Sequence, residues 1–464
     1  FNCFAMGTIE DSMDGIFDGL KEGALTMQQG GGVGYDFSTL RPRGSQAKSV
    51  GSVASGPVSF MQIWDAMCGT LLSTGARRGA MMATLRCDHP DIEAFIDAKG
   101  DSHALRRFNL SVLVTDAFME AVHADRNWAL AFPQENVPPG TKAIMRPWSG
   151  SPEPVRCRVY RHVRARELWD RLMRATYEYA EPGVLFIDRI NQFNNLWYRE
   201  QINTTNPCGE IPLPPYGACD LGSLNLTAFV QDPFTDGARL DLDEIRKTAA
   251  IATRMMDNVI DASLFPLDRQ AAQAQGTRRI GLGLTGLADT LIMLGLHYDS
   301  DAARDLAARI MQAICHTAYR TSVGLAEEKG PFPFFDREKF LQGKFIQSLP
   351  HDIQDGIARF GLRNSHLTAI APTGTISLLA NHVSSGLEPV YEFNHARRVL
   401  ELDGSHTEHR LTDYALRLWR ERRGDERHVR VLGRNAAHEN RQHDGRGRDV
   451  RCERGKRHRC EAGE

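Results

Sequence analysis

The sequence lacks the features of a membrane, secreted or strongly charged protein. No apolar run among its 464 residues reaches the roughly 20 residues that a membrane-spanning helix needs, and no signal peptide is visible. The formal net charge is −2, which gives no electrostatic reason to expect nucleic acid or a membrane as a partner. The nine cysteines are odd in number and irregularly spaced, unlike a secreted disulfide framework. These absences favour a reducing, cytoplasmic location.

The two ends of the chain differ from the rest. The first residue is Phe1 rather than methionine, which we interpret as the cut end of a longer protein. Residues 421–464 contain twelve arginines and no Phe, Trp or Tyr, and no apolar period survives there. A disordered basic tail accounts for this composition. We favour a shifted reading frame instead, because the family resemblance described below ends before this segment.

Helical and strand-like segments alternate along the remaining residues. Apolar spacing predicts helices over 11–27, 58–75, 162–179, 240–263 and 300–330. Short apolar runs such as 366–372 predict strands, whereas the polar residues 133–156 predict a loop. Such alternation is typical of a parallel α/β sheet or barrel. The length exceeds that of one ordinary domain, unless the domain is a single large α/β barrel.

The segment 206-NPCGEIPLPPYGAC-219 places an amide, a thiol and a carboxylate at alternate positions. In a strand, Asn206, Cys208 and Glu210 would point to the same side. The amide can then hold a hydroxyl group, the carboxylate can act as a base, and the thiol can be a nucleophile, a redox group or a metal ligand. Zinc is disfavoured because no histidine or second cysteine has zinc spacing. A buried structural cysteine is the ordinary alternative, but Pro207 and Gly209 favour a special, tight backbone.

Two glycine-containing motifs are less specific. The segment 281-GLGLTG-286 matches GxGxxG, but no hydrophobic strand precedes it, so we expect a glycine-rich loop or helix contact rather than a dinucleotide site. In 371-APTGTISLLA-380, hydroxyl residues precede a possible helix. The first N–H groups of that helix can bind an anion, with added donors from Thr373, Thr375 and Ser377. An ordinary N-cap explains the same residues equally well.

Taken together, several long segments resemble the catalytic chain of ribonucleotide reductase, and most closely its adenosylcobalamin-dependent class. They occur in the family's order, span about residues 2–415, and read 2-NCFAM-6, 31-GGVGYDF-37, 75-GARRGAMMATL-85, 206-NPCGE-210, 219-CDLGSLNL-226, 278-RRIGLGLTGLAD-289, 361-GLRNSHLTAIAPTGTIS-377 and 386-GLEP-389. The resemblance implies a ten-stranded α/β barrel of two five-stranded halves, incomplete here, with the reactive cysteine on a central loop. It also implies an oxidoreductase that reduces ribonucleotides to 2′-deoxyribonucleotides for DNA synthesis and repair, with a disulfide as the oxidised product.

The resemblance assigns catalytic roles to five residues. Cys208 matches the cysteine that carries a thiyl radical and takes the 3′ hydrogen of the substrate. Glu210 matches the base for the 3′ hydroxyl, and Asn206 matches the partner of the ribose hydroxyls. Cys3 and Cys219 match the pair that supplies two electrons and ends as a disulfide, while the 2′ hydroxyl leaves as water.

Other positions match contacts with substrate and effector. The implied substrate contacts are Asn2, Cys3, Gly32, Asn206, Pro207, Cys208, Gly209 and Glu210, together with a phosphate loop of Pro372, Thr373, Gly374, Thr375 and Ile376. Gly374 follows the cobalamin-type pattern and differs from the acidic residue of the iron-dependent class. Asp11 and Arg41 match positions that bind an allosteric nucleotide at a subunit interface. Arg77 matches a loop residue that relays the effector to the substrate base. The glycines at 281–286 match a family feature without a dinucleotide role.

The implied cofactor is adenosylcobalamin. The implied partners are a ribonucleotide, a dNTP or ATP effector, a thioredoxin-like reductant and a second copy in a homodimer. No short motif marks the corrin contacts, so no residue is assigned to them. We expect residues 1–415 to form part of the catalytic barrel and residues 421–464 to lie outside it.

Three alternatives stay open at this point. The first is the catalytic subunit of the class that receives its radical from a separate metal-containing subunit. The second is an inactive nucleotide-binding chain, which the missing barrel ends would favour and the retained cysteines disfavour. The third is a glycyl-radical enzyme, which the lack of a C-terminal glycyl-radical motif disfavours.

Overall fold

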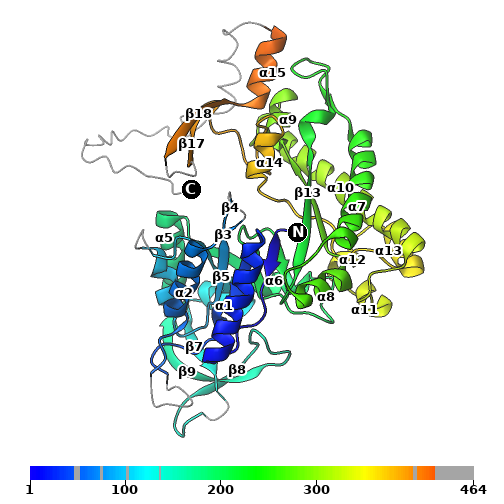
Figure 1. Cartoon of the computed structure of the whole chain (residues 1–464). Coiled ribbons are helices and arrows are strands. Elements are labelled where there is room, and N and C mark those ends of the chain that lie inside the picture. Colours follow the sequence, from blue (N-terminus) through cyan, green and yellow to red (C-terminus); the bar gives the residue numbers. More distant parts are fainter. Residues whose placement is uncertain (46–52, 74–76, 101–103, 135–136, 401–404, 424–464) are drawn as a thin grey trace, which may run out of the picture. The chain divides into compact units, whose positions relative to one another are not determined.

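The computed structural model describes residues 1–45, 53–73, 77–100, 104–134, 137–400 and 405–423 (Figure 1). The chain divides into two compact units. The first unit comprises Phe1–Gly222, Ala249–Leu282 and Cys315–Ala371, and the second comprises Ser223–Thr248, Gly283–Ile314 and Pro372–Glu464. From residue 424 onward, the arginine-rich segment lies outside the described residues.

The largest sheet has seven strands in the order β10-β6-β5-β2-β1-β13-β16. In chain order these strands are β1 (Cys3–Ala5), β2 (Gly32–Asp36), β5 (Met81–Arg86), β6 (Phe108–Val114), β10 (Gly183–Phe186), β13 (Ala218–Asn225) and β16 (Ile280–Thr285). The first five strands of the sheet order are all parallel, whereas β13 pairs antiparallel with β1. Five parallel strands followed by a reversal are what a barrel of two five-stranded halves predicts. The α/β class is confirmed, and the described residues provide an incomplete barrel.

The predicted helices are all present, with ends shifted by a few residues. They are α1 (Met13–Gln28), α2 (Pro57–Thr70), α5 (Ala165–Tyr179), α7 (Leu242–Ala262) and α10 (Asp301–Lys329). Ser12 caps α1 by accepting a hydrogen bond from the Gly15 backbone, and Ser300 likewise accepts from Ala303 at the start of α10. Gly330 follows α10 with a positive φ of 84°, as expected for a residue just after a helix.

The other elements are short helices and small sheets. The remaining helices are α3 (Ile92–Ile96), α4 (Asp116–His123), α6 (Ile187–Gln192), α8 (Asp268–Thr277), α9 (Leu287–Met293), α11 (Arg337–Leu341), α12 (Lys344–Gln347), α13 (His351–Phe360), α14 (Gly374–Leu379) and α15 (Tyr414–Arg423), with 3₁₀ turns η1 (Phe37–Thr39), η2 (Asp97–Lys99) and η3 (Leu226–Phe229). A three-stranded antiparallel sheet joins β7 (Asn127–Pro133), β9 (Val155–Arg164) and β8 (Ala143–Arg146). Two-stranded sheets pair β3 (Leu72–Ser73) with β4 (Arg77–Arg78), β11 (Thr204–Thr205) with β12 (Pro212–Leu213), β14 (Val230–Gln231) with β15 (Arg239–Leu240), and β17 (Asn394–Leu400) with β18 (His406–Thr412).

Three predictions of local structure are corrected. Residues 133–156 are not all loop, because β8 and the start of β9 lie within them. Residues 281–286 are not a loop or helix contact: Gly281 to Thr285 lie in β16, and Gly286 precedes α9 with a φ of 75°. Glycine is needed at position 281 because a Cβ there would lie 2.8 Å from Leu221 and 2.9 Å from Ala369. The run 366–372 forms only a single parallel bridge, Leu282↔Thr368, rather than a strand.

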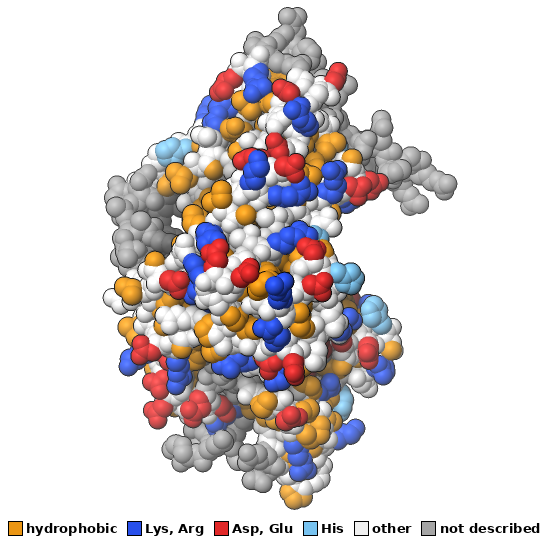
Figure 2. All heavy atoms as spheres, turned by 90° about the vertical axis from the view of Figure 1, so that its right-hand side faces the viewer, with side chains coloured by type: hydrophobic (Ala, Val, Ile, Leu, Met, Phe, Trp, Pro, Cys, Tyr) orange, Lys and Arg blue, Asp and Glu red, His pale blue; other side chains and the backbone are white. Residues whose placement is uncertain are grey.

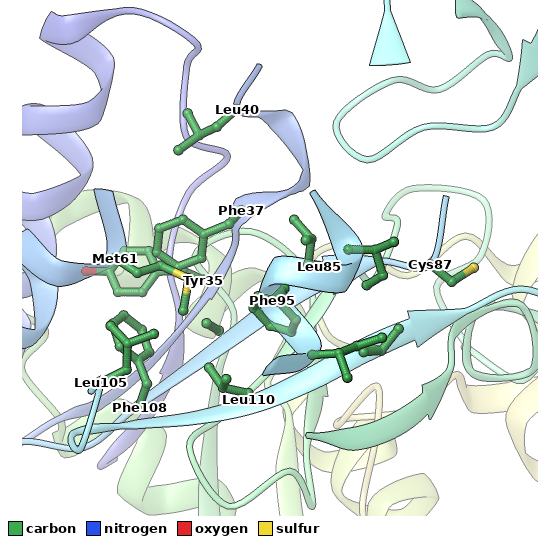
Figure 3. Close-up of a cluster of buried hydrophobic side chains, with 14 of the residues drawn as sticks. Tyr35, Phe37, Leu40, Met61, Leu85, Cys87, Phe95, Leu105, Phe108 and Leu110 are labelled. Atoms are coloured by element: carbon green, nitrogen blue, oxygen red, sulfur yellow. The ribbon is translucent and has the colours of Figure 1, made fainter. Parts of the chain in front are cut away.

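One face of the main sheet carries a large hydrophobic core (Figure 3). Side chains alternate along a strand, and Val33 and Tyr35 of β2 therefore project to the same face. Figure 3 shows Tyr35 and Phe37 among buried side chains that include Met61 of α2 and Phe108 of β6. At about 25 cal/mol per Å² of buried apolar surface, burial of this cluster stabilises the first unit.

The opposite face of the same strands includes several small and polar residues. On β2 these are Gly32 and Gly34, which alternate with the core residues, and on β5 and β6 they include Thr84 and Asn109. On β1, Phe4 belongs to the large core, while Cys3 belongs to a separate small cluster with Cys219. The alternation thus places Cys3 on the face of the sheet that also carries the two glycines.

The surface is mixed in charge. Figure 2 shows basic and acidic side chains interspersed with hydrophobic ones over the described part of the face in view. This mixture agrees with the net charge of −2. None of the helices in the described part of the chain is long and apolar enough to cross a membrane.

Candidate active site

The predicted reactive cysteine lies at the tip of a β-hairpin. Strands β11 and β12 pair through Thr204↔Leu213 and Thr205↔Pro212, and residues 206–211 connect them. The carbonyl of Asn206 accepts a hydrogen bond from the Gly209 backbone at 3.1 Å, which closes a tight turn around Cys208. Gly209 has a φ of 86°, a conformation that glycine adopts without strain.

These residues therefore do not form the extended strand that the alternating pattern assumed. The turn nevertheless brings together two of the three groups that the pattern singled out. Asn206 Nδ2 donates to Glu210 Oε2 at 2.7 Å, although the residues are four positions apart. Cys208 is exposed at the tip, whereas Asn206 is fully buried.

The hairpin is fixed against the small and polar face of the main sheet. A Cβ on Gly34 would overlap the carbonyl oxygen of Thr205, and a Cβ on Gly32 would lie 2.8 Å from Pro207 Cγ. The two glycines thus allow the hairpin backbone to approach β2 closely. Asn109 Nδ2 donates to the Pro207 carbonyl at 2.7 Å, which adds a polar anchor from β6.

Sequence reasoning did not identify Asn109, Gly34 or Thr84 as site residues. Thr84 Oγ1 donates to the carbonyl of Asn203 at 3.0 Å, just before the hairpin. A signal was present, because Gly34 and Asn109 alternate with buried apolar residues along β2 and β6. Alternation alone, however, does not reveal what packs on the second face.

Asn206 is held in one orientation by its neighbours. Its side-chain oxygen accepts from the Ile211 backbone N–H at 3.1 Å, so its Nδ2 is the group that faces Glu210 and Cys3. Nδ2 lies 2.7 Å from Glu210 Oε2 and 3.4 Å from Cys3 Sγ. One amide therefore links the predicted base to one of the two predicted redox cysteines.

Cys3 and Cys219 stand directly opposite each other on neighbouring antiparallel strands. Directly opposed residues in such a pair have Cα atoms about 4.5–5.5 Å apart, a separation within the range of about 4.4–6.8 Å that a disulfide allows. Both thiols are buried in a small apolar cluster with Ile211 and Leu213. Burial raises the pKa of the Cys219 thiol, so this group is protonated at neutral pH.

Two of the predicted effector residues contact each other. Arg41 Nε donates to Asp11 Oδ2 at 2.8 Å, and both side chains are partly buried. Asp11 directly precedes Ser12, the N-cap of α1. Arg77 lies in β4, whose backbone pairs with β3 through Ser73↔Arg77.

The predicted phosphate loop, Pro372 to Ile376, belongs to the second unit. Thr373 precedes α14 with a φ of 58°, and its buried hydroxyl lies 2.9 Å from Thr285 Oγ1 and accepts from the Gly386 backbone at 2.9 Å. Ser377 is also buried and donates to the Gly374 carbonyl. Of the three hydroxyl groups considered, Thr375 is therefore the exposed one.

Comparison with known proteins finds relatives that are named as ribonucleoside-diphosphate reductases or their subunits. The chain is 40% identical over 399 residues to a vitamin B12-dependent ribonucleoside-diphosphate reductase of Mycobacterium tuberculosis, covering 86% of this chain and 50% of the relative. It is 39% identical over 399 residues to a protein of the same name from Thermoplasma acidophilum, covering 86% of this chain and 46% of the relative. A ribonucleoside-diphosphate reductase large subunit of Monkeypox virus is 30% identical over 425 residues, covering 86% of this chain and 54% of the relative.

The chain spans about half the length of these curated relatives. The family described as "Ribonucleotide reductase, barrel domain" matches residues 1–439. That match includes the hairpin, the opposed cysteines and the five parallel strands. The chain therefore belongs to the ribonucleotide reductase family.

Proposed function

We propose that the protein reduces ribonucleotides to 2′-deoxyribonucleotides by a thiyl-radical mechanism. The observation that carries this proposal is the contact of Asn206 with both Glu210 and Cys3, within the hairpin that presents Cys208 at its tip. A thiol, a carboxylate and a pair of opposed cysteines are the groups that this reaction requires. The relatives named as ribonucleoside-diphosphate reductases support the same assignment.

In this mechanism, Cys208 as a thiyl radical removes the 3′ hydrogen atom of the ribose. Glu210 takes the proton of the 3′ hydroxyl, oriented by the amide of Asn206. The 2′ hydroxyl leaves as water, and the Cys3 and Cys219 thiols supply the two electrons and the protons and become a disulfide. Cys208 then returns the hydrogen atom to C3′, so the thiyl radical on Cys208 is regenerated.

Adenosylcobalamin is the proposed source of the radical, and when bound it supplies that radical by homolysis of its cobalt–carbon bond. The chain's residues fit such a group. Cys208 is exposed, so a cofactor outside the hairpin can reach it. Among the described residues no group of three His, Cys, Asp or Glu could hold a metal ion, and a corrin brings its own nitrogen ligands to cobalt. Relatives named vitamin B12-dependent from Mycobacterium tuberculosis and Thermoplasma acidophilum are 39–40% identical, and one from Streptomyces clavuligerus is 31% identical. The viral large subunit is 30% identical, so the higher identities favour cobalamin over a separate radical-generating subunit.

The proposal extends to the partners. A nucleotide effector would bind beside Asp11 and Arg41, whose side chains form an ion pair and therefore lie next to each other. Met13 and Phe17 are exposed on one side of α1, and Ile63 is exposed on α2, which supports a homodimer formed through these helices. A thioredoxin-like dithiol in the cytoplasm would reduce the Cys3–Cys219 disulfide again.

The experiment is to measure deoxynucleotide formation from ribonucleoside di- and triphosphates with adenosylcobalamin and a dithiol. Wild type should form product, whereas Cys208→Ser should form none. Cys315→Ser is the matched control, because Cys315 is a partly buried thiol of α10 that belongs to neither cysteine set, and it should retain activity. Equal activity in wild type and Cys208→Ser would refute the radical thiol.

The same assay separates the alternatives. Product formed only after addition of a metal-containing radical-generating subunit would replace cobalamin as the radical source. Nucleotide binding without product, in this chain and in a chain extended at both ends, would favour the inactive nucleotide-binding protein.

A further inference from the structure

A buried charged cluster lies next to the predicted redox cysteines and has no part in the mechanism above. Arg279 Nη2 contacts Glu200 Oε1 at 2.5 Å, and the side chains are only 3% and 5% exposed. Arg279 Nε donates to His366 Nδ1 at 3.2 Å. Gln273 Nε2 donates to the other oxygen of Glu200 at 3.2 Å. A cation this deeply buried costs several kcal/mol to desolvate. The burial of Arg279 therefore suggests that its charge has a role at this position.

The geometry of β16 sets Arg279 on the face of the sheet against which Cys219 packs. Arg279 directly precedes β16, and it projects to the same face as Gly281, two positions later. A Cβ on Gly281 would lie 3.2 Å from Cys219 Sγ, so that face is the one against which the sulfur packs. Positions two residues apart on a strand are separated by about 7 Å, a distance that an arginine side chain can span.

The charges around Cys219 do not all act in the same direction. Arg279 lowers the pKa of this thiol, while burial, Cys3, Asp220 and Glu210 raise it. His366 is neutral, because burial and Arg279 hold its pKa well below the usual value. Its Nδ1 accepts from Arg279, so its Nε2 carries the proton and donates to Asn194 Oδ1 at 3.1 Å. Arg279 is thus the cation that favours a thiolate at this sulfur.

We propose that Arg279 is a positioning residue for the redox pair, where its guanidinium stabilises the Cys219 thiolate released when a Cys3–Cys219 disulfide is reduced by a dithiol. Glu200 sets the strength of this effect, because its carboxylate partly neutralises the guanidinium. The inference rests on the proposed function, since it takes Cys3 and Cys219 as the pair that is oxidised in each turnover.

The chemical step balances with an external dithiol as the reductant. One thiolate of the dithiol attacks Cys3 Sγ, the more accessible sulfur at 9% exposure against 1% for Cys219. The disulfide breaks, and its electron pair leaves on Cys219 Sγ, beside Arg279. The second thiolate of the dithiol then forms the dithiol's own disulfide and releases Cys3. Two electrons pass to the two cysteines, which take up the two protons given up by the dithiol.

The test compares four variants of the oxidised protein during reduction by dithiothreitol. Arg279→Gln should slow reduction of the Cys3–Cys219 disulfide about tenfold, because a poorer leaving thiolate departs more slowly. Arg279→Lys keeps the charge and should slow it by no more than about threefold. Glu200→Gln should accelerate reduction about threefold, because it removes the opposing charge. Arg254→Gln removes an exposed arginine that pairs with Glu328 and should leave the rate unchanged.

The readout is quenched alkylation followed by mass spectrometry of the peptides that carry Cys3 and Cys219, with thermal melting as a check on folding. A structural role alone predicts that Arg279→Gln and Glu200→Gln act in the same direction, and this result would overturn the inference. If Arg279→Gln does not fold, Glu200→Gln decides: a faster reduction supports the inference, and an equal or slower one overturns it.

The outcomes also distinguish this inference from the proposed function. If the disulfide forms but its rate of reduction does not change when the charge at position 279 is removed, the inference fails and the proposed function stands. If the rates shift as expected but no deoxynucleotide is formed, the inference stands and the function fails. If oxidised wild type never contains a Cys3–Cys219 disulfide, the redox pair itself is refuted.

Discussion

Replacing Gly34 with alanine tests whether close approach of the hairpin to β2 positions the active site. The new Cβ would overlap the Thr205 carbonyl oxygen and lie 2.9 Å from its carbonyl carbon. Carbon atoms pack at about 3.5–4.0 Å, and the oxygen is the closer obstacle, so the hairpin must move away by at least about 1 Å. Because the obstacle is backbone rather than a flexible side chain, we expect the free energy of unfolding to fall by about 3 kcal/mol, the upper end for an overpacked site.

The same displacement should cost activity, because Asn206 and Cys208 move with the hairpin. A misplacement of about 1 Å at reacting groups can lower the rate about 100-fold. The assay is deoxynucleotide formation, with denaturant unfolding measured in parallel. Gly324→Ala is the matched control. Apart from the backbone of its own helix and its chain neighbours, no atom lies within 4 Å of the added Cβ, so α10 should gain about 0.5–1 kcal/mol without loss of activity. Wild-type activity and stability in Gly34→Ala would refute the reasoning.

Three further predictions follow from single contacts. Asn109→Ala removes the hydrogen bond to the hairpin and should lower the free energy of unfolding by about 1 kcal/mol. Turnover should show a larger relative loss, and turnover equal to that of wild type would contradict this prediction. Iodoacetamide at pH 8 should label Cys208 before Cys219, since Cys208 is exposed and burial raises the pKa of Cys219. Peptide mass spectrometry measures the order of labelling, and the reverse order would contradict the hairpin geometry. Burial and Asp289 raise the pKa of Asp413 from 3.8 to about 8, so its protonated form stabilises the fold below about pH 4 and this stability is lost as pH rises to 8. Asp413→Asn mimics the protonated acid, and its melting temperature should exceed that of wild type by a margin that grows over this range; a constant margin would argue against the shifted pKa.

Much of the fold could be predicted from local pattern. Apolar spacing and caps located the long helices to within a few residues, because helix ends depend on nearby residues such as Ser300 and Gly330. The alternation of helices and strands gave the α/β class for the same reason. The segment 281–286 was misjudged because its glycines, which suggest a loop, serve close strand packing against Leu221 and Ala369, and that contact is distant in sequence.

The candidate site divides in the same way. The sequence by itself determined which groups are available: an amide, a thiol and a carboxylate within five residues, and two further cysteines at positions 3 and 219. Only the tertiary structure decided which of them meet. It turned the segment into a hairpin rather than a strand, and it set Cys3 opposite Cys219 through pairing of strands some 200 residues apart in sequence.

The physical reason for this division is that a sequence pattern indicates which side chains share a face of a strand or helix. It does not indicate which distant segment packs against that face. Gly34, Asn109 and Arg279 each look ordinary in their own segments. Each acquires its meaning from a partner in another segment: the hairpin backbone for Gly34 and Asn109, and the sulfur of Cys219 for Arg279. Such contacts depend on strand order and register, which the folded chain alone establishes.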